Sequence, residues 1–341
     1  MKVKLLFFVT KSYSLSILKP IDSYCKTLND LETAWFIVGK IKNNIKGTVI
    51  RESKQVFDFN PDAIIVPGNV VPDFWPGLKV QIFHGLCEEK KGHYKITGFF
   101  DLYCTPGPLI TEKFEKIKKE KNTFLVKETG WPKLDDCVNF KSISDQKTFF
   151  SLDSDTKVIL YAPTFSPKYR SSGDLFEPIK KTQDFGYHWV VKFHELEKKE
   201  IIRKYKELIS SKFTIIEDNN ILLWLNAADL LITDTSSVAY EFLIFDRPII
   251  TYNTTTRFEK GINITDPDDL TGAITRSFND PEEYSESRQE ILNDIHPYLD
   301  GKSSERLIQS INETIDNGEC LKLKKKSLNW FRKWKIRRLI S

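Results

Sequence analysis

The stretch 229–252 of this 341-residue chain, DLLITDTSSVAYEFLIFDRPIITY, most constrains the fold. Residues 230–233 form an apolar run of strand length, residues 238–245 carry apolar side chains at helical spacing, and residues 248–252 form a second apolar run. A strand, a polar turn, a helix and a second strand within this length are typical of a βαβ crossover. The pattern therefore predicts a parallel sheet, with the polar turn at the carboxyl end of its first strand.

The polar turn consists of Asp234, Thr235, Ser236 and Ser237. Backbone N–H groups and hydroxyls at a helix N-terminus, next to the end of a parallel strand, favour phosphate binding. Serine also caps helices where no ligand binds, and the two roles are compatible. Asp234 either orients a neighbouring group or only ends the strand. The turn is a candidate phosphate site, with helix capping as the alternative.

Apolar runs of strand length alternate with helical or turn segments along the rest of the chain. The runs lie at 2–10, 35–38, 48–50, 63–67, 79–83, 124–127, 157–162, 189–193 and 213–216, and predicted helices at 17–28, 198–210, 221–226, 266–278, 281–293 and 301–315. This alternation predicts an α/β fold with helices covering parallel sheets. The chain is long enough for two domains, and the polar segment 135–155 is the predicted boundary. We expect domains at 1–145 and 146–318 and a tail at 319–341.

The composition and the missing motifs exclude several classes of protein. Five cysteines without a CxxC pair argue against a disulfide framework, so a reducing cytoplasm is expected. The first ten residues are typical of a strand and not of a signal peptide, and no stretch reaches the ~18 apolar residues of a membrane span. The sequence contains no HExxH, P-loop or GxGxxG motif. Neither a metal nor a cofactor is expected.

Polar residues follow other predicted strands as well. His84 comes directly after the run 79–83, where a neutral imidazole can accept a proton from a hydroxyl or can only cap the strand. Thr164 follows the run 157–162. Lys192 and His194 are two residues apart at the end of another strand, so we expect them on one face. A purely structural pair is the alternative for those two.

The net charge of +4 hides an asymmetry between the tail and the rest of the chain. Residues 320–341 hold nine Lys or Arg residues and no acidic residue, which leaves residues 1–319 with a net charge of −5. Trp330, Phe331 and Trp334 lie among these cations, as in helices that bind an anionic membrane surface. A solvated or disordered basic end is the alternative. The acidic balance elsewhere argues against nucleic acid as a partner.

Taken together, these motifs resemble those of the CDP-glycerol glycerophosphotransferase family of teichoic-acid and capsule synthesis. The segments that carry the resemblance are His84-Gly85, YAPTF at 161–165, Lys192-Phe193-His194, 229–237 with DRPII at 246–250, and DGKSSER at 300–306. The resemblance implies a GT-B fold, in which two Rossmann-like domains with parallel sheets face each other across a cleft. The expected architecture adds a basic amphipathic C-terminal helix.

The resemblance also implies transfer of a polyol phosphate, glycerol phosphate first, from a CDP-activated donor to a hydroxyl of a glycan, lipid-linked or polyol-phosphate acceptor, with release of CMP. It makes His84 the candidate base on the acceptor side and His194 the partner of the donor phosphate. Ser236 and Ser237 become the pyrophosphate cradle. Further donor-side candidates are Thr164, Lys192, Asp234 and Thr235.

Three residues depart from the family pattern: Leu86 replaces the usual threonine, Glu195 a common proline, and Thr235 a common tyrosine. The departures remove no proposed functional group, but they bear on the choice of acceptor and polyol. We expect an enzyme at the inner face of the cell membrane.

Two other functions remain as alternatives. One is a GT-B nucleotide-sugar glycosyltransferase or a sugar 2-epimerase-like enzyme, which would share the phosphate turn. The other is a non-catalytic protein that docks on a membrane or RNA through its tail.

Overall fold

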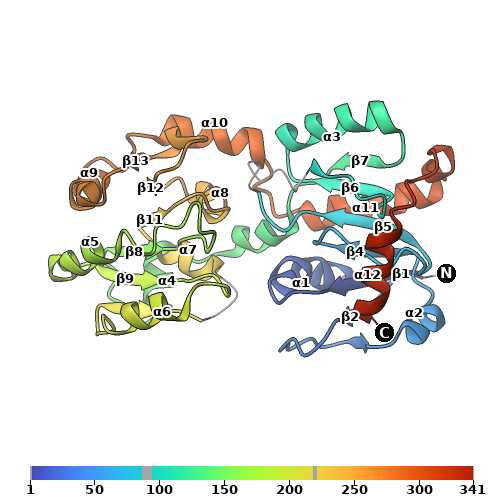
Figure 1. Cartoon of the computed structure of the whole chain (residues 1–341), viewed down its shortest axis with the longest axis horizontal. Helices are drawn as coiled ribbons and strands as arrows, with labels where there is room; N and C mark the ends of the chain where they lie inside the picture. Colours follow the sequence, from blue (N-terminus) through green and yellow to red (C-terminus); the bar gives the residue numbers. More distant parts are fainter. Residues whose placement is uncertain (1, 87–93, 218–220, 341) are drawn as a thin grey trace. The chain divides into compact units, whose positions relative to one another are not determined.

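The computed structural model describes residues 2–86, 94–217 and 221–340, which form two compact units. The first unit comprises Met1–Val138 and Asp294–Ser341, and the second comprises Asn139–Asn293. Each unit has its own parallel sheet (Figure 1). In sequence, the second unit is a continuous insertion into the first.

The first unit is built on a seven-stranded sheet of order β3-β2-β1-β4-β5-β6-β7, in which all neighbouring strands are parallel. Its strands are β1 (Val3–Val9), β2 (Leu31–Ile37), β3 (Thr48–Ile50), β4 (Ala63–Val66), β5 (Leu78–Ile82), β6 (Leu102–Thr105) and β7 (Leu125–Glu128). The central strands are near-continuous apolar runs, since helices cover both faces of such a sheet. The helices of this unit are α1 (Ser14–Cys25), α2 (Ser53–Phe59), α3 (Pro108–Lys121), α11 (Ser303–Asp316) and α12 (Trp330–Ile340).

The second unit is built on a six-stranded parallel sheet of order β10-β9-β8-β11-β12-β13. Its strands are β8 (Val158–Tyr161), β9 (His188–Val191), β10 (Phe213–Ile215), β11 (Leu230–Thr233), β12 (Ile249–Tyr252) and β13 (Ile262–Ile264). The helices of this unit are α4 (Ile143–Phe149), α5 (Phe176–Lys181), α6 (Lys199–Lys206), α7 (Leu222–Ala227), α8 (Val238–Phe242), α9 (Leu270–Asn279) and α10 (Ser285–Ile295), and the last two residues of α10 belong to the first unit. The predicted βαβ crossover is confirmed, because β11 and β12 are parallel neighbours joined through α8.

The compact units differ from the expected domains at 1–145 and 146–318. The division falls at residue 138, and the chain returns to the first unit at residue 294. The reason is that α11 packs against α1, and the buried Asp135 carboxylate accepts hydrogen bonds from the Ser303 and Ser304 amides at 2.9 and 2.6 Å. Those contacts join residues that are 168 and 169 positions apart, which a local sequence pattern does not reveal.

The tail forms a short 3₁₀ turn, η7 (Glu319–Lys322), and the helix α12, which Figure 1 shows beside the first sheet. Ile336 is buried in the hydrophobic core of the first unit, and Ile340 packs against the same core. Lys333 pairs with Asp73 at 2.9 Å. In this structure the tail is therefore a helix that packs on the first unit. No described helix is long and apolar enough to cross a membrane.

Candidate active site

Three strands of the second sheet end side by side, because β9, β8 and β11 are consecutive in the sheet. The loops that follow them are 162–175, 192–198 and 234–237. Every donor-side candidate named from the sequence lies on one of these three loops. The topology therefore brings the predicted donor residues to one edge of the sheet, as expected for the carboxyl ends of parallel strands.

Asp234 is the most buried of the candidates, with 1% of its surface exposed. Its Oδ1 accepts a hydrogen bond from the Thr164 amide at 2.8 Å, and its Oδ2 accepts from the Ser171 amide at 3.0 Å and the Ser171 hydroxyl at 2.8 Å. Burial raises the pKa of Asp234 to about 6, although those hydrogen bonds act in the opposite direction. Both oxygens are engaged within the chain, so Asp234 acts on the site through the loop that it holds.

Thr235, Ser236 and Ser237 follow Asp234 and are half-buried. The Ser236 amide donates to the Asp234 carbonyl at 2.8 Å, which closes a tight turn. Within the described residues, Ser237 is the N-cap of α8 but makes no hydrogen bond to the helix through its side chain. Of the two serines that the sequence offered as helix caps, Ser237 makes no such contact with the described residues, whereas the Ser236 hydroxyl accepts a hydrogen bond from the amide of Val238, the first residue of α8, at 3.4 Å.

The helix after this turn is shorter than the sequence predicts. The expected helix at 238–245 consists of α8, which has five residues, and one 3₁₀ turn, η4 (Leu243–Phe245). Helix-dipole effects depend on a run of aligned peptide units, so a short helix contributes little to anion binding. Phosphate binding at this turn would therefore depend on the hydroxyls of Ser236 and Ser237 more than on the helix dipole.

His194 is an exposed residue on the loop after β9. Its Nδ1 accepts a hydrogen bond from the Leu196 amide at 3.1 Å, and its ring lies 4.2 Å from the ring of Phe165, centroid to centroid. With Nδ1 acting as an acceptor, the neutral imidazole carries its proton on Nε2, which is then the donor. The predicted strand at 189–193 ends at Val191, so strand alternation does not fix the faces of Lys192 and His194.

His84 in the first unit is half-buried, two residues after the end of β5. Its ring lies 5.8 Å from the ring of Tyr13, which follows β1. The carbonyl of the preceding residue, Phe83, accepts a hydrogen bond from the Trp131 indole at 2.6 Å. The main chain that carries His84 is thus held from the loop after β7.

Trp131 is itself held by His296, a residue that sequence reasoning missed. The Trp131 amide donates to His296 Nε2 at 3.0 Å, and both residues are buried. Burial lowers the pKa of His296 to about 4, so the imidazole stays neutral and can accept this hydrogen bond. His296 lies 165 residues from Trp131, so no local sequence pattern links the two residues.

Two further motifs that carry the family resemblance, at 246–250 and 300–306, each contain an arginine that contacts other residues of its own unit. Arg247 donates to the carbonyls of Asn226 and Ala228 at 2.6 and 2.7 Å. In the first unit, Arg306 pairs with Asp300 at 2.6 Å and lies 4.3 Å above the ring of Tyr298. These contacts fix the loops that surround the two motifs.

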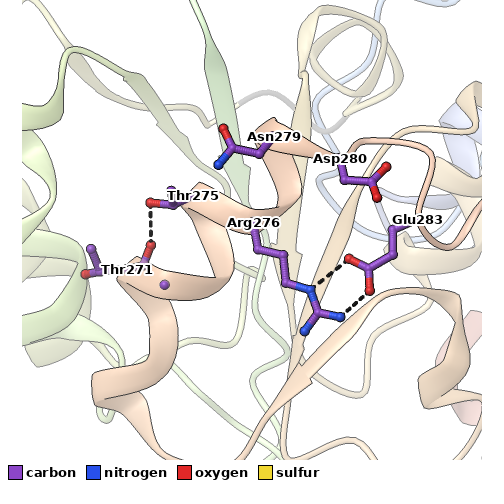
Figure 2. A pocket seen from close by; sticks show the side chains of 7 residues that line it. Thr271, Thr275, Arg276, Asn279, Asp280 and Glu283 are labelled. Atoms are coloured by element: carbon purple, nitrogen blue, oxygen red, sulfur yellow. Dashed lines mark hydrogen bonds and ion pairs between the residues drawn. The ribbon is translucent and has the colours of Figure 1, made fainter.

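A groove of about 670 Å³ lies along α9 of the second unit, and Figure 2 shows the side chains that line it. Its lining residues are Thr271, Gly272, Thr275, Arg276, Asn279, Asp280 and Glu283. Arg276 is paired with Glu283 across the groove, with Nε and Oε2 2.8 Å apart. The lining includes none of the candidate residues, so we assign the groove no part in the chemistry.

Residues 87–313 match the family profile described as CDP-glycerol:poly(glycerophosphate) glycerophosphotransferase. A teichoic acid poly(glycerol phosphate) polymerase of Bacillus spizizenii is 29% identical over 176 residues, which cover 48% of this chain and 43% of the relative. A teichoic acid ribitol-phosphate polymerase, TarL, of Staphylococcus aureus is 31% identical over 178 residues, which cover 46% of this chain and 30% of the relative. The matched region thus spans less than half of either relative.

The wall teichoic acid polymerase TagF has a similar solved structure, with a TM-score of 0.74 and 19% identity over 92% of this chain and 89% of that chain. The UDP-GlcNAc 2-epimerase of Neisseria meningitidis gives a TM-score of 0.64 and 15% identity, over 91% and 100% of the two chains. Both likenesses concern the fold, and they confirm the predicted GT-B type. The family match covers most of the sequence and confirms the resemblance carried by the motifs: the chain belongs to the CDP-glycerol:poly(glycerophosphate) glycerophosphotransferase family.

Proposed function

We propose that this protein transfers a polyol phosphate from a CDP-activated polyol to a hydroxyl of a glycan or polyol-phosphate acceptor and releases CMP. The observation that carries the proposal is the family match over residues 87–313, which include His194, Ser236 and Ser237. The names of the relatives refer to glycerol phosphate and to ribitol phosphate. CDP-glycerol is the donor that the family description favours, and CDP-ribitol is the second candidate.

The donor pyrophosphate binds at the edge of the second sheet in this proposal. Ser236 and Ser237 donate hydroxyl hydrogen bonds, and His194 donates through Nε2, which the Leu196 contact leaves as the protonated nitrogen of the neutral ring. Hydrogen-bond donors fixed before the reaction stabilise the charge that grows on the phosphoryl and leaving oxygens. Thr164, Lys192, Asp234 and Thr235 shape the surrounding loops.

His84 is the proposed base for the acceptor hydroxyl, which attacks the β-phosphorus of the donor. The imidazole takes the hydroxyl proton while the bond between the β-phosphorus and the CMP oxygen breaks. His84 lies three residues before the start of the family match, so its role depends on its place at the end of β5. General-base assistance typically contributes roughly 10²- to 10⁴-fold to the rate.

The test compares His84→Gln with the wild-type protein in a CMP-release assay with CDP-glycerol and a polyol-phosphate acceptor. We expect a loss of roughly 10²- to 10⁴-fold in kcat. His188→Gln is the matched control, since His188 begins β9 at the opposite end of that strand from the site. Near-normal turnover of His84→Gln would remove His84 from the mechanism. Release of UMP or UDP from nucleotide sugars, with none from CDP-polyols, would favour the glycosyltransferase or epimerase alternative.

We also propose that α12 attaches the protein to the anionic inner face of the cell membrane. Its aromatic residues Trp330, Phe331 and Trp334 are 73%, 65% and 51% exposed. Aromatic and basic residues together favour the interface of an anionic bilayer. Attachment there would bring the enzyme to a lipid-linked acceptor.

The membrane proposal is tested with a triple variant, in which Trp330, Phe331 and Trp334 are each replaced by Gln. The variant keeps Ile336 in the core, so the helix remains docked. We expect wild-type protein to sediment with vesicles that contain anionic lipid and the variant to stay in the supernatant. Equal binding of both proteins would contradict the role of the aromatic residues.

A further inference from the structure

Two adjacent serines in the loop after β8 have no exposed surface and were not singled out from the sequence. Ser171 and Ser172 are both 0% exposed. The Ser171 hydroxyl donates to Asp234 Oδ2 at 2.8 Å, and the Ser172 hydroxyl donates to Glu197 Oε2 at 2.9 Å. A single dipeptide is thus hydrogen-bonded to two buried carboxylates.

The two carboxylates belong to the two other loops at this edge of the sheet. Asp234 begins the turn that continues into Ser236 and Ser237. Glu197 lies three residues after His194, and its amide donates to the His194 carbonyl at 2.9 Å. The dipeptide therefore connects the loop that carries His194 to the loop that carries the two candidate phosphate-binding serines.

Further hydrogen bonds hold the dipeptide from the core. The Tyr161 hydroxyl lies 2.8 Å from the Ser171 hydroxyl, and the Tyr205 hydroxyl donates to the Ser172 carbonyl at 3.1 Å. Tyr161 comes from β8 and Tyr205 from α6, and both side chains are buried. The network thus extends from the interior of the second unit to its strand-end loops.

Glu197 completes the network on the other side. Its Oε1 accepts a hydrogen bond from the Lys198 amide at 2.8 Å, and the Arg170 guanidinium lies 3.6 Å from the same oxygen. Buried carboxylates are costly to desolvate, and hydrogen bonds of this kind only offset that cost. An apolar contact would hold the loop with less desolvation, so stability alone does not account for two such carboxylates beside the candidate residues.

We propose that Ser171 and Ser172 are positioning residues of the donor site, which hold the loops of His194 and of Ser236-Ser237 in one arrangement. The role in donor binding rests on the proposed function, whereas the role in ordering the loops does not. Neither serine contacts the donor in this proposal. They act through Asp234 and Glu197, so their loss weakens donor binding more than it slows the chemical step.

The test measures KM for CDP-glycerol and kcat for Ser171→Ala and Ser172→Ala. Loss of a hydrogen bond to a charged group predicts an increase in KM of about 10-fold, with kcat changed by less than about 3-fold. Ser277→Ala is the matched control. Ser277 is also a buried serine of the second unit, 3% exposed on α9, and no described residue pairs with its hydroxyl. We expect wild-type KM for that variant.

Hydrogen exchange of the Thr164 and Ser171 amides, measured without any substrate, provides a second readout. We expect faster exchange at both amides in Ser171→Ala and wild-type exchange in Ser277→Ala. Glu197→Gln, which keeps the shape of the side chain, tests the second carboxylate if either alanine variant fails to fold. For that variant we expect a smaller rise in KM, about 3-fold, because an amide oxygen still accepts from Ser172.

The outcomes separate the two proposals. If wild-type protein releases no CMP, the proposed function fails, and the exchange measurement still tests the loops. If wild-type protein is active but folded Ser171→Ala and Ser172→Ala keep wild-type KM, the positioning role is overturned, even where both variants melt at a lower temperature. Unchanged exchange at Thr164 and Ser171 would overturn it as well.

Discussion

The loops that carry the candidate residues are held by different chemistry in the two units. In the first unit, the main chain before His84 is held by neutral groups, the Trp131 indole and the His296 imidazole. In the second unit, buried carboxylates hold the loops, with Asp234 and Glu197 accepting from Ser171 and Ser172. The difference matches the proposed roles, because a base on the acceptor side needs one fixed main-chain position, whereas a pyrophosphate site needs several loops fixed together.

The same difference gives the two units opposite responses to acid. His296 has a lowered pKa, so between pH 6.5 and about 4 the unfolded chain binds more protons than the folded one. Asp234 has a raised pKa, so between pH 3.8 and about 6 the folded chain binds more protons than the unfolded one. On these two groups alone, acid destabilises the first unit and stabilises the second.

The largest expected effect is that of Asp234→Ala on the second unit. The substitution leaves the Thr164 amide and the amide and hydroxyl of Ser171 without their acceptor. Each unsatisfied buried group costs ~1–3 kcal/mol, so the free energy of unfolding should fall by about 4 kcal/mol. Urea denaturation measures the loss. Asp234→Asn, which keeps one acceptor oxygen, should lose less, and equal losses for the two variants would contradict this account.

The second expected effect is the pH response itself. Lowering the pH from 7 to 4 should destabilise the first unit by roughly 3 kcal/mol through His296 and remove a cost of similar size from the second unit through Asp234. Urea titrations at each pH, followed by hydrogen exchange of peptides from each unit, measure the two responses separately.

His296→Gln and Asp234→Asn are the controls for the pH response. Each should flatten the pH dependence of its own unit and leave that of the other unit unchanged. If His296→Gln kept the full acid response of the first unit, other groups would have to account for it.

A smaller effect is expected for Trp131→Phe. The substitution removes the indole donor to the Phe83 carbonyl and costs about 2 kcal/mol in unfolding free energy. Because Phe83 precedes the proposed base, we expect kcat to fall several-fold while KM for CDP-glycerol stays unchanged. The result would be the reverse of that for Ser171→Ala. A raised KM for CDP-glycerol in Trp131→Phe would contradict this contrast, in which the loops of the first unit affect kcat and those of the second unit affect KM.

The smallest expected effect is that of Arg276→Ala in the groove along α9. The pair with Glu283 is exposed at the surface, and such pairs contribute little to stability. We expect wild-type kcat and KM in the CMP-release assay. A loss of activity would give the groove in Figure 2 a role that its lining residues do not suggest.

Local patterns in the sequence were enough to predict the strands and the residues that follow them. The strand at 230–233 and the strand at 48–50 were predicted with the bounds that the structure has. His84 and the turn at 234–237 lie at strand ends as expected, because an apolar run followed by polar residues marks the carboxyl end of a buried strand.

The supporting contacts were not predictable in this way. Ser171 is 63 residues from Asp234, and His296 is 165 residues from Trp131. The residues next to each of these in the sequence give no sign of a hydrogen-bond partner. The contact forms only when folding brings the distant partner close. The extent of the second domain was misjudged for the same reason, since the partner amides of Asp135 follow 168 and 169 positions later.

That last separation sets an order of events during synthesis on the ribosome. At roughly 5–20 residues per second, the amides of Ser303 and Ser304 emerge about 8 to 34 s after the Asp135 carboxylate that they bind. During this interval the whole second unit is made, while the first sheet lacks α11 and α12. The first unit therefore completes its fold only after the whole second unit has been made, and a nascent-chain chaperone would meet the first sheet with its surface for α11 still uncovered.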